Sequence, residues 1–430
     1  MAPRTPELLK TQGSVFRRIG RSRLLVFFAI MGPGLITANA DNDAGGITTW
    51  SVAGAHYGYQ LLWILLLITP ILAVTQEMGA RMGTVTGKGL AALIRERFSL
   101  KVTAFAMLAM LIANFGTTVA EFSGIAAGFS LFHVPAYIAV PLVSVGVWLL
   151  ITRGSYWRVE KVFLVLCTIY VTYIIAGFLA HPNWGKALHS TVVPSVTWNS
   201  TWLLTVIAAI GTTITPWGQF FIQASVVDKK ISLKNYVYTK AEVFFGAFVT
   251  DVVDFFIVVA CAATLYASHT LVNSAQDAAK ALRPLAGELA FLLFGLGLLN
   301  VSILAAGILP LATAYAVCEA FGFEAGLDSK FKDAPIFNGL LTIFIFIPAL
   351  VAIIPHLPLI KVMLISQDVN GILLPIILIY VLKVINDKSV MGEHVNGPVY
   401  NVVAWTFSIV LIVLSVVLLG WSLPLPFLHH

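Results

Sequence analysis

Charged residues are scarce in this chain of 430 residues: aspartate, glutamate, lysine and arginine together make up only 11% of it. A soluble domain carries about 25% charged residues, so this composition excludes a soluble protein. Hydrophobic residues reach 59%, and apolar windows of about 20 residues recur along the whole length. We therefore expect a single transmembrane domain, residues 1–430, with the lipid bilayer as its surroundings and no separate soluble domain.

Several other features are missing as well. The three cysteines each lie alone in apolar runs, so we expect neither a disulfide framework nor a cysteine-based metal motif. The nine histidines lack ligand spacing, and no nucleophile–base set, phosphate-binding loop or pore-like repeat is visible. These absences argue against an enzyme, a channel and a resident cofactor. The net charge of +6 reflects basic loops rather than nucleic-acid binding, and the basic N-terminus does not resemble a cleavable signal peptide.

Eleven apolar segments are long enough to span a bilayer. They lie at residues 24–56, 59–80, 102–130, 134–152, 160–180, 200–227, 238–266, 284–320, 336–354, 359–384 and 399–421. If the N-terminus is cytoplasmic, all but four of the 26 lysines and arginines fall on the inner side. This bias follows the positive-inside rule. It predicts an integral protein of the plasma (inner) membrane whose C-terminus lies outside.

The first span is interrupted at residues 41–46, which read Asp-Asn-Asp-Ala-Gly-Gly. An aspartate at mid-membrane costs a few kcal/mol and usually faces a cavity or a partner. Gly45 and Gly46 weaken the helix, and opened backbone carbonyls are tolerated only where they line a wet or protein-walled site. A carboxylate with free carbonyls suits a small cation, so we interpret Asp43 as half of an ion site. The alternative is a glycine-rich kink in which the aspartates only cap the second half-helix.

A second break lies in the sixth span at residues 211–219, where Pro216 has no backbone N–H and Gly218 follows. Breaks at corresponding positions, five spans apart, are typical of transporters built from two inverted repeats, with the binding site at mid-membrane. We therefore predict one repeat at residues 24–180, a second at 200–384, and an additional span at 399–421.

The motifs around these breaks resemble those of the natural resistance-associated macrophage protein (Nramp) family of divalent-metal transporters. In chain order they are Gly32-Pro33-Gly34, Asp43-Ala44-Gly45-Gly46, Ala53-Gly54-Ala55, Gly58-Tyr59-Gln60-Leu61-Leu62-Trp63, Gln76 and Gly83-Thr84-Val85-Thr86-Gly87-Lys88. The match needs no gap between its first and last motif, is patchy in span six, and is weak afterwards. The resemblance implies an all-α fold of the LeuT type, with 5+5 inverted repeats, discontinuous helices 1 and 6, and eleven transmembrane helices.

The resemblance also implies the ligands of a transported cation. They are Asp43, Thr215, the backbone carbonyls of Ala40 and Thr212, and Gln367, acting directly or through water, while Gly45, Gly46, Pro216 and Gly218 permit the unwinding. Where the family has a methionine this chain has Thr215, and where the family has the asparagine of its Asp-Pro-Gly-Asn motif this chain has Gly46. An oxygen site without sulfur suits partly hydrated Mg²⁺. The pattern is thus most similar to the Nramp-related magnesium transporter branch, although a rewired Mn²⁺ site or an Al³⁺ site stays open.

The proton path of the family looks altered. The family has Asp-x-x-Glu in span three and a histidine after the proline of span six, whereas this chain has Thr118, Glu121 and Trp217. The loss of two protonatable groups predicts metal uptake without proton coupling. The membrane potential can drive such uptake, since moving two charges through 100 mV supplies roughly 4.6 kcal/mol. An equally good interpretation of Glu121 is a carboxyl group hydrogen-bonded within the bundle.

The main hypothesis is therefore secondary transport of Mg²⁺ by alternating access. A proton-coupled Mn²⁺/Fe²⁺ transporter is the first alternative, and an amino-acid or polyamine carrier of the same fold is the second. The sequence assigns no firm role to Asp41, Asp251, Asp254, Asp368 and Asn370, and it does not fix the oligomeric state.

Overall fold

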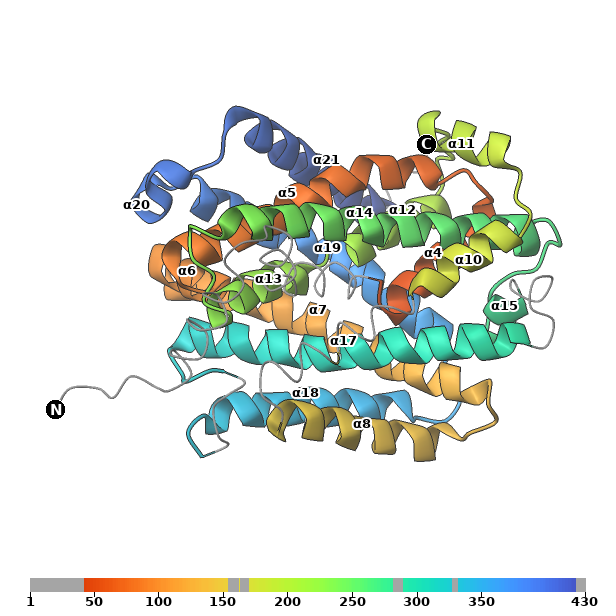
Figure 1. The fold of residues 1–430 in the computed structure, drawn as a ribbon, viewed down its shortest axis with the longest axis horizontal. Coiled ribbons are helices and arrows are strands. Elements are labelled where there is room, and N and C mark those ends of the chain that lie inside the picture. The colour runs from red at the N-terminus through yellow and green to blue at the C-terminus, as the bar shows by residue number, and fades with distance from the viewer. Residues whose placement is uncertain (1–41, 154–161, 163–169, 281–288, 327–331, 423–430) are drawn as a thin grey trace, which may run out of the picture.

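The computed structural model describes residues 42–153, 162, 170–280, 289–326 and 332–422, and within these ranges every regular element is helical (Figure 1). The helices are α4 (Ala44–Tyr57), α5 (Leu62–Thr86), α6 (Leu90–Arg97), α7 (Leu100–Ser130), α8 (Ala136–Arg153), α10 (Tyr170–Leu179), α11 (Trp184–Val192), α12 (Ser200–Thr213), α13 (Pro216–Asp228), α14 (Tyr236–Cys261), α15 (Ala275–Lys280), α17 (Leu289–Phe321), α18 (Pro335–Ala352), α19 (Leu359–Ile385), α20 (Lys388–Met391) and α21 (Pro398–Ser422).

In the described part of the chain, nine helical segments are long and apolar enough to cross a membrane, with α12 and α13 forming one of them. This confirms the predicted all-α polytopic fold. Helices α4 and α10 supply the described halves of the predicted first and fifth spans. Residues 24–41, which include the first motif, Ala40 and Asp41, lie outside the described residues. The short helices α6, α11 and α20 were not predicted, and the repeat boundaries stay predictions.

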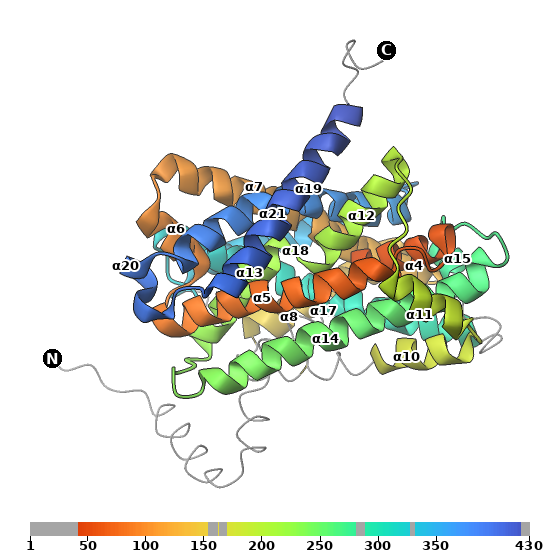
Figure 2. The same cartoon turned by 90° about the horizontal axis from the view of Figure 1, so that it is seen from above.

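Helix α7 lies at the centre of the bundle and packs against α17, α18 and α19 (Figure 1). On the other side of the bundle α14 packs against α4, α5 and α10. Seen from above, α21 lies across α19 and α5 (Figure 2). Helices α4 and α13 are buried along nearly their whole length. Because every face of these two helices is buried, their sequences show little amphipathic pattern.

Helices α12 and α19 touch backbone to backbone, because glycines face each other where they cross. A Cβ atom at Gly371 would lie 2.5 Å from the carbonyl oxygen of Ile207, and one at Gly211 would lie 2.3 Å from the carbonyl oxygen of Gln367. No side chain fits at either position. This contact brings the end of α12, where the sixth span breaks, against the middle of α19.

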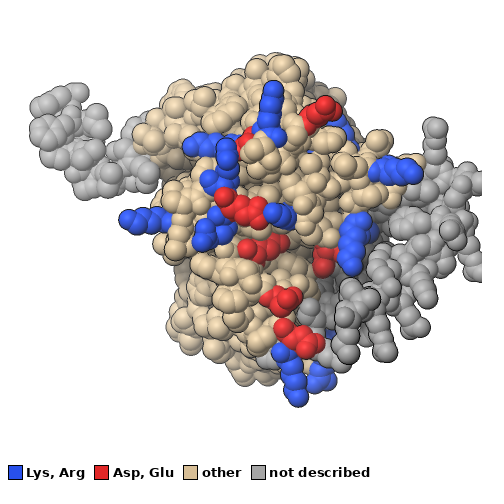
Figure 3. All heavy atoms as spheres, turned by 90° about the vertical axis from the view of Figure 1, so that its left-hand side faces the viewer, with Lys and Arg blue, Asp and Glu red and all other residues tan. Residues whose placement is uncertain are grey.

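Charged side chains gather on the end of the molecule formed by α6, α20 and the turn between α13 and α14 (Figures 1 and 3). Here Lys88 Nζ lies 2.6 Å from Glu96 Oε1, and Arg97 pairs with Asp387. Hydrogen bonds from Ser389, together with the charge of Arg97, lower the pKa of Asp387. The predicted topology makes this end cytoplasmic.

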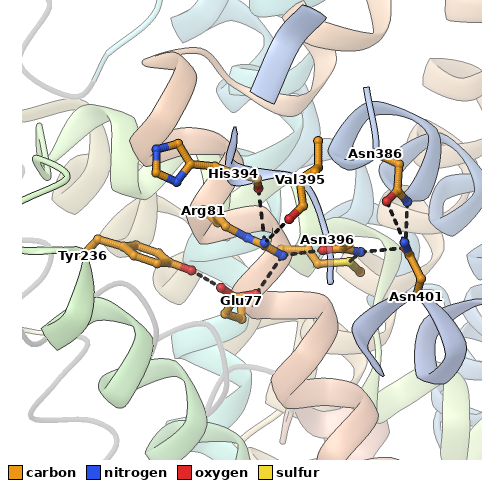
Figure 4. Close-up of polar contacts among 9 residues, drawn as sticks. Glu77, Arg81, Tyr236, Asn386, His394, Val395, Asn396 and Asn401 are labelled. Carbon is orange, nitrogen blue, oxygen red and sulfur yellow. Dashed lines mark hydrogen bonds and ion pairs between the residues drawn. The ribbon is translucent and has the colours of Figure 1, made fainter. Parts of the chain in front are cut away.

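A polar network joins α5, α14 and the segment before α21 at the same end (Figure 4). Arg81 donates to the backbone carbonyls of His394 (3.2 Å) and Val395 (3.3 Å), and it pairs with Glu77 at 3.2 Å. The Tyr236 hydroxyl on α14 donates to the other side of the Glu77 carboxylate. The network therefore fixes the start of α21 to two helices far away in sequence.

The glycine contact gives a first prediction. Gly371→Ala should lower the free energy of unfolding by roughly 1–3 kcal/mol, because its methyl group meets rigid backbone. Gly146→Ala is the matched control, since a Cβ there meets nothing within 4 Å and alanine favours a helix by about 1 kcal/mol. Thermal unfolding in detergent compares the two variants, and equal stability would contradict the close approach of α12 and α19.

Candidate functional site

Asp43 is the N-cap residue of α4 and is fully buried. Its Oδ1 accepts a hydrogen bond of 2.7 Å from the backbone N–H of Gly46. An N-cap side chain of this kind satisfies one of the free N–H groups that begin every helix. The other oxygen, Oδ2, receives no hydrogen bond from the described residues. Asp43 thus does what the capping alternative proposed, and it still has one oxygen to offer a ligand.

Glu121 on α7 lies beside Asp43 and is also fully buried. Its Oε2 accepts a hydrogen bond of 3.2 Å from the backbone N–H of Ala44, so Glu121 supports the same helix start. Its Oε1 has no hydrogen-bond donor among the described residues. The carboxyl group is therefore hydrogen-bonded within the bundle. Two carboxyl groups converge on one helix N-terminus, whose partial positive charge favours them there.

Gln367 on α19 reaches the same point. It is fully buried, and its Nε2 lies 3.3 Å from Oδ1 of Asp43. A Cβ at Gly45 would lie only 1.8 Å from this nitrogen, so the glycine leaves the space that the amide fills. The structure therefore brings Gln367 and Asp43 together across 324 positions of sequence, while the ligand role of Gln367 stays a prediction.

Thr215 repeats at α13 the geometry of Asp43 at α4. It is the N-cap residue of α13, 1% exposed, and its hydroxyl accepts a hydrogen bond of 3.2 Å from the backbone N–H of Gly218. Pro216 occupies the first helical position, where no N–H is needed. Both α4 and α13 are thus buried helices whose N-cap side chain accepts a hydrogen bond from the N–H three residues ahead.

The four residues expected to permit unwinding lie just after the breaks rather than within them. Gly45 and Gly46 belong to the first turn of α4, and Pro216 and Gly218 belong to the first turn of α13. The sixth span is interrupted only at Ile214 and Thr215. A cap that satisfies the free N–H groups allows helix to resume at once, so the unwound stretch is short.

The remaining predicted site residues lie nearby with different surroundings. Thr212 is in the last turn of α12, 1% exposed, and its hydroxyl has no hydrogen-bond partner in the described part of the chain. The Thr118 hydroxyl donates a hydrogen bond of 2.6 Å to the backbone carbonyl of Asn114 in its own helix. Trp217 is buried in the core with its ring 6.2 Å from that of Phe221. Ala40 lies outside the described residues.

Three contacts around the site were not foreseen from the sequence. Asn42 donates to the backbone carbonyl of Thr250 on α14 at 3.1 Å. The Thr48 hydroxyl donates to Met363 Sδ at 3.5 Å, which places a sulfur one turn of α19 before Gln367. Asn370 bonds both Gln367 and α7. Most of these contacts join residues far apart in sequence. The Asn370–Gln367 pair is the exception, and its three-residue spacing on a helix could have indicated the contact.

Among the described residues no three histidine, cysteine, aspartate or glutamate side chains lie together as a metal cluster. If a cation binds at Asp43, its shell must therefore include amide, hydroxyl or backbone oxygens or water. The arrangement can offer one to two carboxylates and several neutral oxygen donors in a fully buried position.

A comparison with family models decides the family. The Nramp model, described as natural resistance-associated macrophage protein-like, matches residues 34–420. This chain belongs to the Nramp family. It is consequently a membrane transporter and not an enzyme.

Relatives and solved structures agree with this assignment. The divalent metal cation transporter MntH of Erwinia tasmaniensis is 28% identical over 422 residues, which cover 96% of this chain and 98% of that protein. MntH of Acidiphilium cryptum is 27% identical and covers 95% of this chain and 94% of that protein. The manganese transporter of Eremococcus coleocola, in a complex with an aromatic bis-isothiourea compound, has a TM-score of 0.75 at 21% identity, covering 90% of this chain and 85% of its own.

A more distantly related solved structure has the same fold. MhsT in complex with L-phenylalanine has a TM-score of 0.57 at 13% identity, covering 94% of this chain and 99% of its own. Together with the Eremococcus coleocola structure it confirms the predicted LeuT-type architecture of this Nramp protein. At these identities the solved structures establish the fold alone.

The matching caps give a second prediction. Thr215→Ala should lower the free energy of unfolding by about 1 kcal/mol, because the N–H of Gly218 loses its partner inside the protein. Thr215→Ser keeps the hydroxyl and should stay close to the wild type. Thermal unfolding midpoints in detergent provide the comparison. If serine and alanine destabilise equally, Thr215 does not cap α13.

Proposed function

We propose that this Nramp protein carries a divalent metal cation across the membrane by alternating access, with Asp43 as the central charged ligand. One observation carries the proposal: the carboxyl groups of Asp43 and Glu121 are both fully buried and lie side by side at the break. Burying two neighbouring carboxylates is costly, and a bound cation relieves that cost. The printed names of the MntH relatives support the cargo class.

The ligand chemistry of the site favours Mg²⁺ as the cargo. The side chains around the break offer carboxylate, amide and hydroxyl oxygens, and Thr215 stands where the family has a methionine. Mg²⁺ prefers oxygen ligands and keeps several of its waters, so it fits a site with few protein ligands. Thr118 and Trp217 cannot titrate, which supports uptake driven by the membrane potential without proton coupling.

The similar proteins favour the other cation. The Eremococcus coleocola transporter is a manganese transporter by its printed description, and the MntH relatives match this chain over nearly its whole length. On this point the comparisons support the Mn²⁺/Fe²⁺ alternative better than Mg²⁺. An amino-acid or polyamine cargo has only the shared fold in its favour.

Uptake into proteoliposomes tests the site and the cation together. Mg²⁺ and Mn²⁺ are offered separately, with a pH dye inside and a negative internal potential. We expect Mg²⁺ entry without acidification, and we expect Asp43→Asn to abolish it while the protein stays folded, because asparagine caps a helix as well as aspartate does. Wild-type rates in Asp43→Asn would refute the site, whereas Mn²⁺ entry with acidification and no Mg²⁺ entry would establish the alternative.

A selectivity prediction follows from the ligand at position 215. Thr215→Met adds a thioether and should raise the ratio of Mn²⁺ to Mg²⁺ uptake, because sulfur prefers the softer metal. Thr215→Ser, which keeps the oxygen and the cap, is the control and should leave the ratio unchanged. An unchanged ratio in Thr215→Met would mean that this side chain lies outside the shell of the cation.

A further inference from the structure

Asn370 forms the link between the candidate cation ligand Gln367 and helix α7. It lies one turn after Gln367 on α19 and is fully buried. Its Nδ2 donates to Gln367 Oε1 at 2.9 Å and to the Thr117 hydroxyl oxygen at 3.0 Å. The Thr117 hydroxyl lies 3.2 Å from Asn370 Oδ1 and 3.0 Å from the carbonyl oxygen of Ala113. The result is a continuous polar chain from Asp43 to α7.

This chain of hydrogen bonds sets which end of the Gln367 amide meets Asp43. Because Asn370 donates to Oε1, Gln367 turns its Nε2 toward Oδ1 of Asp43, at 3.3 Å. An amide N–H suits an unoccupied carboxylate, but it repels a cation. A cation bound at Asp43 therefore needs the Gln367 amide turned by half a rotation, so that Oε1 faces the site.

We propose that Asn370 and Thr117 are positioning residues that let the Gln367 amide take both orientations. In the empty site Gln367 Oε1 accepts from Asn370, as seen here. In the loaded site both amides are turned: Gln367 Nε2 donates to Asn370 Oδ1, and Gln367 Oε1 faces the cation. The inference rests on the proposed function, since it supposes that a cation binds at Asp43.

Thr117 can pair with Asn370 in both orientations. A hydroxyl is both donor and acceptor, so it accepts from Asn370 Nδ2 in one orientation and donates to Asn370 Oδ1 in the other. When it accepts from Asn370, its own proton is given to Ala113. In each orientation the Asn370 atom that faces Gln367 and Thr117 therefore has a partner on both of them. The bound cation then selects the orientation in which Gln367 Oε1 faces it. This favours a cation that takes a neutral amide oxygen as a ligand.

The decisive variant is Asn370→Asp, because a carboxylate can accept from Gln367 but cannot donate to it. It should hold Gln367 with Oε1 toward the site before the cation arrives. In proteoliposomes we expect the half-saturating concentration of the transported cation, Mg²⁺ or Mn²⁺, to fall by roughly threefold to tenfold, the worth of one hydrogen bond. Asp43→Asn is the inactive reference.

The same substitution in a Gln367→Ala background separates orientation from simple charge attraction. The proposal predicts that Asn370→Asp then brings no gain, because no amide remains to be oriented. A gain of equal size in both backgrounds, or no gain in a folded Asn370→Asp single variant, would overturn it. If the wild type takes up neither cation, the proposed function itself fails and the inference fails with it.

A measurement on the unmodified side chains covers the case in which the introduced buried carboxylate prevents folding. The wild-type protein, labelled with ¹⁵N at asparagine and glutamine side chains, is titrated in detergent with diamagnetic Mg²⁺ or Cd²⁺. Signals are assigned from spectra of Gln367→Glu and Asn370→Ser. We expect the Asn370 amide signal to shift with that of Gln367 at saturation, although Asn370 does not touch the cation. A shift of Gln367 alone would contradict the relay.

Discussion

Two buried helix starts, those of α4 and α13, impose the main physical constraint on this protein. A helix start leaves free N–H groups, and in a buried position no bulk water can satisfy them. Asp43 and Thr215 each answer the problem with a side-chain oxygen bonded three residues ahead, at 2.7 and 3.2 Å. Glu121 adds a second carboxylate at the start of α4. The close packing of α7, α14 and α19 around α4 follows, because a capped but polar helix start has to be enclosed by protein.

This constraint also shapes the electrostatics of a cation site. A helix N-terminus carries about half a positive charge, so the start of α4 would by itself oppose the binding of a cation there. The carboxyl groups of Asp43 and Glu121 reverse the sign at α4, and the C-terminal end of α12, with Thr212 in its last turn, adds negative backbone dipoles. Gln367 fills the space left by Gly45 and shields Asp43 with an amide. The charged ligand is thus kept buried, partnered on one oxygen and open on the other.

Local sequence was enough to predict the described membrane-spanning helices and the break between α12 and α13, because hydropathy, glycine and proline act over short distances. The role of Asp43 stays a prediction. The short helices α6 and α11 escaped prediction since neither spans a bilayer. The capping role of Asp43 was left open as an alternative, and Gly45 and Gly46 lie in the first turn of α4. The Asn370–Thr117 contact joins residues 253 positions apart, and no periodic pattern within one helix could reveal it. The fold could therefore be predicted from composition, whereas the hydrogen bonds of the site depend on how distant helices pack.

The proposed transport depends most on a cation binding at the buried carboxylate of Asp43. The most direct measurement is a crystal structure of the protein soaked with Mn²⁺, with anomalous diffraction data, followed by competition of the anomalous signal with excess Mg²⁺. The account predicts one mid-membrane peak next to Oδ2 of Asp43, in contact with an oxygen of Gln367, that Mg²⁺ displaces. A peak at the buried aspartates of α14, with none at Asp43, would contradict it.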